Sequence, residues 1–296
     1  MRIEPKGGIL GATIHDVDLS RHLSDEEIRQ IELALGEYGV VCFPKQQLTS
    51  KQLRDYAERF GSLEINVANM FHDEAFPEVM ILSNMKENGK PIGLADAGQD
   101  WHTDMSYSKD IAFANVLYGI KIPFRDGRSL GNTEFSNMHA AYEDLPEDLK
   151  KELDGMTITH DFNKFWEMMR REKGSTRPPL TEEQRRCKPP VPHPVFLVHP
   201  ITGRKVLYAN PGYSVRINEL PEARSAEVLD FLFKHQLHEK YRYRHQWAEG
   251  DVLMWDNMGT IHNAVADYGP DEHRLIKRCQ VMADRYFPNG TMAQRG

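Results

Sequence analysis

The sequence predicts a mainly β protein of the α+β class, in which antiparallel strands form the core and helices attach to its outside. Short apolar stretches bounded by Gly, Pro, Asn and Asp recur along most of the chain, which is typical of strands. Clear helical spacing of apolar residues, by contrast, is found in three segments. The helices are therefore expected to be additions to a β core.

The three predicted helices are recognised by their first residues and their apolar spacing. The first two begin with a capping box, in which a Ser or Thr and a Glu or Gln three residues later bind each other's backbone amides. The pairs are Ser24 with Glu27 and Thr49 with Gln52. Gly36 and Gly39 are expected to end the first helix and Gly61 the second. The third helix is predicted over 221–236, beginning at a proline.

The apolar stretches predict strands at 40–43, 79–82, 113–122, 195–198, 205–208, 251–255 and 275–282. One segment, 167–194, is different because it contains clusters of charges and six prolines. We expect it to be a long loop or lid. Since strand-like sequence continues on both sides of it, residues 1–296 are predicted to form a single domain with this insertion.

Composition narrows the class of protein. The 296 residues are 40% hydrophobic and 27% charged, which is ordinary for a soluble globular chain. A net charge of -7 without a basic patch argues against nucleic acid as a partner. Three cysteines far apart in sequence form neither a CxxC motif nor a disulfide framework. With no signal-like start and no apolar run of about 18 residues, we expect a cytoplasmic protein that does not bind a membrane.

The tripeptide His102-Thr103-Asp104 is a candidate metal motif. Residues two apart on a strand point to the same side, so both side chains could reach one ion. With a second histidine they would form a two-His-one-carboxylate triad, which leaves three coordination positions open for an iron(II) oxygenase. The tripeptide alone is common, and a surface histidine beside a turn aspartate is an equally good interpretation.

The distal part of the chain supplies a second histidine and two arginines. Residues 250–262 are predicted to form a turn, a buried strand and a second turn that ends at His262. Further on, Arg274 and Arg278 would share one face of an extended strand, which is costly unless they meet anions. Arginine is suited to a bidentate grip on a carboxylate. The alternative is that both are exposed arginines of an edge strand.

Taken together, these segments closely resemble the taurine dioxygenase and 2,4-dichlorophenoxyacetate dioxygenase family. The resemblance lies in WHTD at 101–104, GNT at 131–133, WDN at 255–257, His262 and HRLIKR at 273–278, with AERFGSLE at 57–64 and HP.TGRK at 199–205 in support. It covers nearly the whole chain. It implies a double-stranded β-helix (jelly-roll) core with flanking helices, and an enzyme that uses iron(II), 2-oxoglutarate and O2 and releases succinate and carbon dioxide.

The resemblance also implies roles for individual residues. His102, Asp104 and His262 would bind iron, Arg274 would grip the distal carboxylate of 2-oxoglutarate, and Thr133 would hydrogen-bond that same carboxylate. Related halogenases replace the metal carboxylate by a small residue, so the presence of Asp104 favours hydroxylation. Where the hydroxylated carbon bears oxygen, nitrogen or sulfur, the product would then break apart.

The substrate expected from the resemblance is a small organic anion. His72 and Arg278 match residues that hold the anionic end of the substrate, and Phe162 and Tyr213 fall in segments that border the pocket. A surface histidine and core aromatics are the alternative interpretation of His72 and of these rings. We favour an aryl or aryloxyalkanoate carboxylate as the substrate over a sulfonate or sulfate ester.

The competing class is a non-enzymatic jelly-roll protein that binds a metal or anion, which would predict a broken triad. Because relatives commonly form dimers or tetramers, a homo-oligomer is expected. The remaining histidines, such as His139, His199 and His245, lack metal-ligand partners at suitable spacing and are expected to be structural or surface residues.

Overall fold

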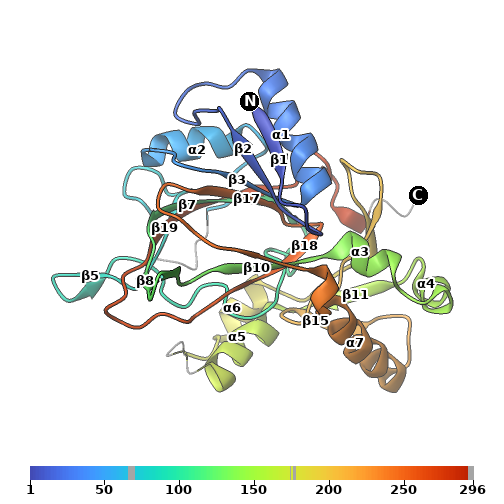
Figure 1. The fold of residues 1–296 in the computed structure, drawn as a ribbon. Coiled ribbons are helices and arrows are strands. Elements are labelled where there is room, and N and C mark those ends of the chain that lie inside the picture. Colours follow the sequence, from blue (N-terminus) through green and yellow to red (C-terminus); the bar gives the residue numbers. More distant parts are fainter. Residues whose placement is uncertain (66–70, 174, 176–177, 293–296) are drawn as a thin grey trace.

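The computed structural model describes residues 1–65, 71–173, 175 and 178–292, and it shows a mainly β protein with several attached helices (Figure 1). The strands are β1 (Arg2–Pro5), β2 (Ala12–His15), β3 (Val40–Phe43), β4 (Met80–Ser83), β5 (Lys86–Glu87), β6 (Lys90–Pro91), β7 (Ala112–Lys121), β8 (Phe124–Arg125), β9 (Arg128–Ser129), β10 (Thr133–Asn137), β11 (Thr157–His160), β12 (Val191–Pro194), β13 (Phe196–Val198), β14 (Lys205–Leu207), β15 (Ser214–Ile217), β16 (Arg242–His245), β17 (Val252–Asp256), β18 (Thr260–Ala264) and β19 (Leu275–Met282). The helices are α1 (Asp25–Tyr38), α2 (Ser50–Glu58), α3 (Met138–Glu143), α4 (Glu147–Leu153), α5 (Phe162–Glu172), α6 (Glu182–Cys187), α7 (Glu222–Gln236) and the 3₁₀ turn η1 (Glu239–Tyr241).

The largest sheet has the strand order β1-β2-β3-β17-β7-β19-β4. Its neighbours are antiparallel except for β2 and β3, which run parallel. Strands from the end of the sequence, β17 and β19, lie between strands from its first half, so the sheet cannot form until distant segments meet. Every predicted strand is present, with its ends displaced by no more than one residue.

A second sheet, β16-β10-β18, faces the large sheet across an apolar layer. Successive residues of β17 alternate between two environments, as the pleat requires. Leu253 and Trp255 point into this inner layer, where the Trp255 ring lies 5.4 Å from the Phe135 ring of β10. Met254 points the other way, towards Tyr56 of α2. The inner layer therefore joins the two sheets, and the outer layer joins the large sheet to its helices.

The first two helices cover the outer face of the large sheet, at the top of Figure 1. Both predicted capping boxes are present, at Ser24 and at Thr49. Gly39 ends α1 with a φ of 67°, as predicted, and a Cβ there would lie 2.5 Å from a Leu10 methyl. The predicted role of Gly36 is wrong, because this residue lies inside α1; α2 likewise ends at Glu58, before Gly61.

The insertion (residues 167–194) differs from the long loop that was predicted. It begins inside α5, contains α6 and ends in β12, which pairs with β11; residues 174, 176 and 177 lie outside the described part. A capping box between Thr181 and Gln184 starts α6. The sequence concealed this helix because none of its residues is buried, so it has no apolar periodicity.

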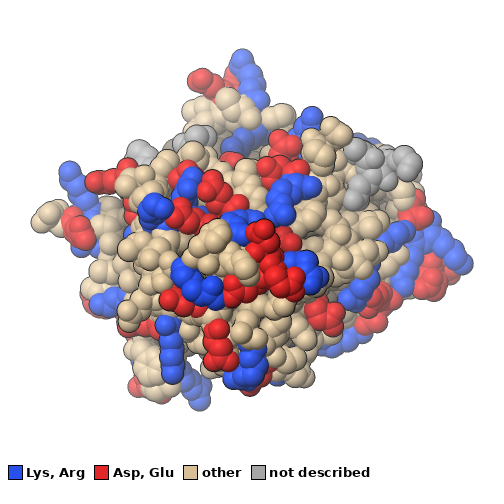
Figure 2. Space-filling view, turned by 90° about the horizontal axis from the view of Figure 1, so that it is seen from above, with Lys and Arg blue, Asp and Glu red and all other residues tan. Residues whose placement is uncertain are grey.

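The outer surface mixes charges of both signs. Figure 2 shows Lys and Arg interspersed with Asp and Glu on the face seen from above. Many of them are paired, as in Arg54–Glu58 and Arg59–Asp25. No helix in the described ranges has the length and apolar character needed to cross a bilayer.

Candidate metal and co-substrate site

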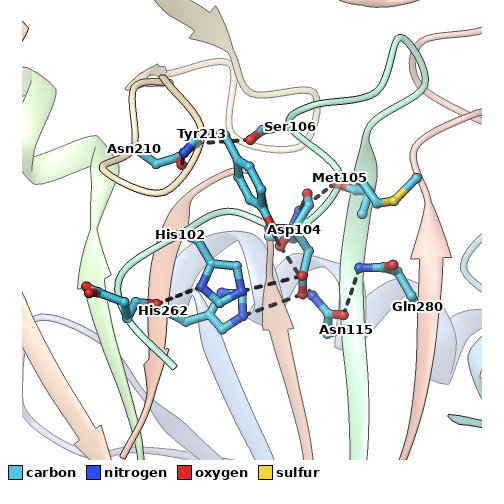
Figure 3. Close-up of polar contacts among 12 residues, drawn as sticks. His102, Asp104, Met105, Ser106, Asn115, Asn210, Tyr213, His262 and Gln280 are labelled. Carbon is cyan, nitrogen blue, oxygen red and sulfur yellow. Dashed lines mark hydrogen bonds and ion pairs between the residues drawn. The ribbon is translucent and has the colours of Figure 1, made fainter. Parts of the chain in front are cut away.

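His102 and His262 lie side by side where β18 faces the segment that follows Asp100 (Figure 3). Their backbones exchange two hydrogen bonds, of 3.0 and 2.9 Å, and their ring centroids are 4.2 Å apart. The Asp104 carboxylate completes the group, with one oxygen 3.5 Å from Nε2 of His102 and the other 3.5 Å from Nε2 of His262. The three side chains predicted to bind one metal are therefore together, and all are buried.

The expectation that His102 and Asp104 lie on one strand is wrong. His102 makes only an isolated bridge to His262, and Asp104 lies in a turn. Asp100 and Met105 on either side have positive φ angles of 86° and 57°. Non-glycine residues rarely adopt this conformation, and it is often found at functional sites. The turn, not a strand pleat, brings the carboxylate to the imidazoles.

Asn257 holds this turn in place. Its side chain accepts a hydrogen bond of 3.2 Å from the Asp104 amide and donates one of 2.9 Å to the Asp104 carbonyl. Asn257 is fully buried and follows β17, so the WDN motif connects the large sheet to the turn. The sequence marked Asn257 only as part of a motif and gave no role for it.

Both imidazoles are in the form that binds a metal. The Nδ1 atom of His102 lies 2.8 Å from the Asp100 carbonyl and donates to it, which leaves a lone pair on Nε2. Burial, together with the neighbouring His102, lowers the pKa of His262 to about 4. A metal ligand must be unprotonated, so this shift prepares His262 for coordination.

Arg278 acts directly on the third side chain. Its Nη2 lies 3.0 Å from the Asp104 carboxylate, and its Nε donates to the Asn115 side chain at 3.0 Å. Burial alone would raise the pKa of Asp104, but the Arg278 charge and the two imidazoles hold it well below its usual range. Asp104 is therefore an ionised carboxylate, as metal binding requires.

Arg274 immediately precedes β19 and is only 7% exposed. Its backbone is held by Asn84 and Ser83, and its guanidinium lies over the Tyr268 ring, 5.8 Å from the ring centroid. Within the described part of the chain, its Nε has no hydrogen-bond partner. In the same part of the chain, no carboxylate oxygen lies within 4.0 Å of its guanidinium nitrogens. A Cβ on Gly131 would be 2.8 Å from that Nε, so the glycine makes room for the side chain. A buried guanidinium without a carboxylate partner suits an incoming anion.

Thr133 follows Gly131 by two residues and begins β10. Its hydroxyl oxygen accepts a 3.0 Å hydrogen bond from the Trp247 indole. In the described ranges its own hydroxyl hydrogen has no recorded acceptor, so it is available to a carboxylate oxygen. The two residues predicted for 2-oxoglutarate are thus linked through Gly131.

The predicted substrate residues fall into two groups. His72 and Arg278 line one small pocket, together with Glu64, Glu78 and Gln280. The structure brings the two predicted residues together as expected, but the pocket also contains two acidic side chains, which disfavour an anion there.

The other group is aromatic and lies against His102. The Tyr213 and Phe165 rings are 6.1 and 5.1 Å from the His102 ring. Tyr107 lies 4.7 Å from both Tyr213 and Phe162, so these rings form a continuous surface that leads away from the metal site. Tyr107 was missed by the sequence reasoning, because nothing in its local pattern marks it.

A second buried group, His139, His199 and Asp256, also has ligand atoms close together. Nδ1 of His199 accepts hydrogen bonds from the amides of Ile201 and Thr202, at 3.3 and 3.2 Å. The ring proton of a neutral His199 is therefore on Nε2, 3.0 Å from the Asp256 carboxylate. This tautomer leaves no lone pair for a metal, so we interpret the group as structural.

A buried group of two histidines and one carboxylate is the ligand set of non-haem iron(II) oxygenases. The family model "Taurine catabolism dioxygenase TauD, TfdA family" matches residues 2–280, and the chain belongs to this family. It is accordingly an iron(II)- and 2-oxoglutarate-dependent dioxygenase that acts on a small molecule.

Individual relatives agree with this. The chain is 31% identical to the alpha-ketoglutarate-dependent 2,4-dichlorophenoxyacetate dioxygenase of Cupriavidus pinatubonensis, over 95% of this chain and 97% of that one. It is also 31% identical to pentalenolactone F synthase of Streptomyces avermitilis, over 94% and 92%. The solved structure of AAD-2 in complex with Mn(II) and N-oxalylglycine matches with a TM-score of 0.79 at 26% identity, covering 95% of this chain and 98% of that one.

Proposed function

We propose that the protein hydroxylates a C–H bond of a small aryl or aryloxyalkanoate carboxylate. Iron(II) would be held by His102, Asp104 and His262, and 2-oxoglutarate by Arg274 and Thr133. The observation that carries this proposal is the combination of an ionised, buried carboxylate between two imidazoles with a buried guanidinium that lacks a counter-ion. A buried carboxylate between two imidazoles suits a metal cation, and a buried guanidinium without a counter-ion suits a carboxylate, so a metal and a dicarboxylate together would satisfy both positions.

When bound, iron(II) and 2-oxoglutarate supply the oxidising power of O2 for C–H hydroxylation, with release of succinate and carbon dioxide. The chain's own residues position and protect this chemistry. Asp100 orients His102 through its carbonyl, and Arg278 keeps Asp104 ionised. Arg274 is buried, so the low dielectric constant around it would strengthen its bond to a carboxylate.

The aromatic surface is the proposed place of the substrate's apolar body. Phe162 and Tyr213 belong to it, and Tyr213 is buried directly beside His102. His72 and Arg278 are proposed to hold the anionic end. The 31% identical dichlorophenoxyacetate dioxygenase supports an aryloxy acid as the substrate. If the hydroxylated carbon bears an ether oxygen, the product collapses and the bond is cleaved.

A sulfonate or sulfate ester is the second candidate substrate, and the description of the matching family as taurine catabolism dioxygenases favours it. The fold we propose for both cases is a double-stranded β-helix, supported by the two facing sheets and their inner apolar layer. A single domain over 1–296, a homodimer or homotetramer, and a cytoplasmic location remain predictions from the sequence.

The experiment that tests this proposal is a panel of aryl carboxylates and matched sulfonates, scored by substrate-dependent succinate release. We expect a carboxylate to be turned over best. Arg278→Ala and His72→Ala should each raise its KM, by about 10- to 100-fold for the arginine. The matched control is Arg216→Ala, since Arg216 is exposed on β15.

A panel in which sulfonates are preferred would replace the first candidate by the second. A carboxylate whose KM is unchanged in both variants would remove His72 and Arg278 from the anion site. Absence of any succinate release, coupled or uncoupled, would contradict the proposed site as a whole.

A further inference from the structure

One lysine of the insertion reaches the aromatic surface beside the metal site. The ammonium of Lys188 lies 5.0 Å from the centroid of the Tyr107 ring and 5.0 Å from that of Phe162. The side chain is half-buried, and burial lowers its pKa. Among the described residues, no carboxylate comes within 4.0 Å of this ammonium and it donates no recorded hydrogen bond. A half-buried cation that contacts two ring faces and no carboxylate retains unused capacity for an anion.

The chain fixes this position firmly. The Lys188 amide donates to the Gln184 carbonyl at the end of α6, and β12 begins three residues later. On the other side of α6, Lys173 pairs with Asp100 at 3.1 Å, next to His102. The insertion is therefore attached to the metal-binding segment as well as to the aromatic surface.

Tyr107 separates Lys188 from the metal site. Its ring lies 4.7 Å from Tyr213, whose ring is 6.1 Å from that of His102. The charges of Asp104, Arg278 and Glu64 all act on the Tyr107 hydroxyl. Lys188 and His102 thus contact different members of one chain of aromatic rings, Lys188 through Tyr107 and Phe162 and His102 through Tyr213.

We propose that Lys188 is a specificity-determining residue, which binds a carboxylate or sulfonate at the end of the substrate that is remote from the metal. The preferred substrate would then be an aryl acid with a second anionic group across the ring from the carbon that is hydroxylated. This inference rests on the proposed function and names its substrate class more closely.

Glu64 is the acidic group that competes with such an anion. Its charge stabilises the Lys188 ammonium, although the two are not within ion-pair distance. Burial raises the pKa of Glu64, so its own charge is poorly stabilised there. A substrate anion that approaches Lys188 more closely than Glu64 does would form the stronger contact. Glu64→Gln should therefore preserve or strengthen the preference for a second anion.

The test compares three probes that differ at one position: phenoxyacetate, para-carboxyphenoxyacetate and the neutral para-carbamoylphenoxyacetate. KM is measured by substrate-dependent succinate release. For the wild type we expect the dianion to have a KM on the order of 10- to 100-fold below that of the carbamoyl probe. Lys188→Ala should abolish that difference and Lys188→Arg should keep most of it. The matched control is Lys240→Ala, because the Lys240 ammonium lies 4.9 Å over the Tyr241 ring but outside this site.

Equal KM values for the dianion and the carbamoyl probe in the wild type would overturn the proposal, and so would a preference that survives in Lys188→Ala. Failure of the protein to accept the dianion at all would overturn it too. The anaerobic visible absorption of the iron–2-oxoglutarate chelate, recorded for every variant, separates these results from a failure of the proposed function. A variant that loses the preference for the dianion but keeps the absorption band of the chelate tests the role of Lys188 and not the proposed function.

Discussion

Replacing Arg274 by methionine should stabilise the metal-free protein while abolishing 2-oxoglutarate binding. The guanidinium is 7% exposed and its Nε has no partner. Burial lowers its pKa, and only Tyr268 and the charge of Asp267 oppose this effect. An uncompensated buried charge that is exchanged for an apolar side chain of similar length should raise the free energy of unfolding by about 1–3 kcal/mol. That corresponds to roughly 2–4 °C in Tm for each kcal/mol.

The assay is thermal unfolding in the presence of a chelator, repeated with 2-oxoglutarate and a non-oxidising metal. At a concentration of about 100 Kd the co-substrate should stabilise the wild type by about 2.7 kcal/mol and leave Arg274→Met unchanged. Arg216→Met, at an exposed position of β15, should change stability by less than about 0.5 kcal/mol and keep the response. A methionine variant that is less stable than the wild type, or that 2-oxoglutarate still stabilises, would refute this reasoning.

Two further predictions concern the same site and the core. Gly131→Ala should lower the free energy of unfolding by about 1–2 kcal/mol, because the glycine has a φ of 65°. It should also raise the KM for 2-oxoglutarate, since the new Cβ displaces Arg274. Gly127→Ala, with a φ of 77° and open space around it, should show only the loss of stability from backbone strain. If Gly131→Ala left the KM for 2-oxoglutarate unchanged, even with a stability loss that differs from that of Gly127→Ala, the result would argue against this packing. Burial lowers the pKa of His193 to about 4, below its unfolded value of about 6.5, so the folded protein binds fewer protons between these values. The free energy of unfolding should therefore fall as pH decreases from about 6.5 to 4, and His193→Gln should flatten that dependence in urea titrations; an equally steep profile would contradict it.

Seven of the strands and the helices α1, α2 and α7 could be predicted because their signals are local. Apolar runs mark strands, and the capping pair at Ser24 is visible within four residues. The short helix α6 could not be found, since none of its side chains is buried and its helical spacing has no apolar face.

The three side chains proposed to bind the metal were selected from the order of motifs along the chain, and the structure brings them together, but their geometry was not predicted. The turn at Asp104 depends on the positive φ of Met105 and on Asn257, more than 150 residues away in sequence. A positive φ at a non-glycine residue leaves no mark in the sequence. Tyr107 and Lys188 were not found for a similar reason, because their contacts join segments far apart in the chain, Tyr107 with Tyr213 and Lys188 with Tyr107.

The most direct measurement of the central claim is the anaerobic absorption spectrum on addition of iron(II) and 2-oxoglutarate. The wild type should develop the weak visible charge-transfer band of the chelate. His262→Ala should lose the band together with iron affinity, and Arg274→Met should lose the band but retain iron binding. A wild type without the band, or a His262→Ala protein with the band and iron affinity unchanged, would contradict the account.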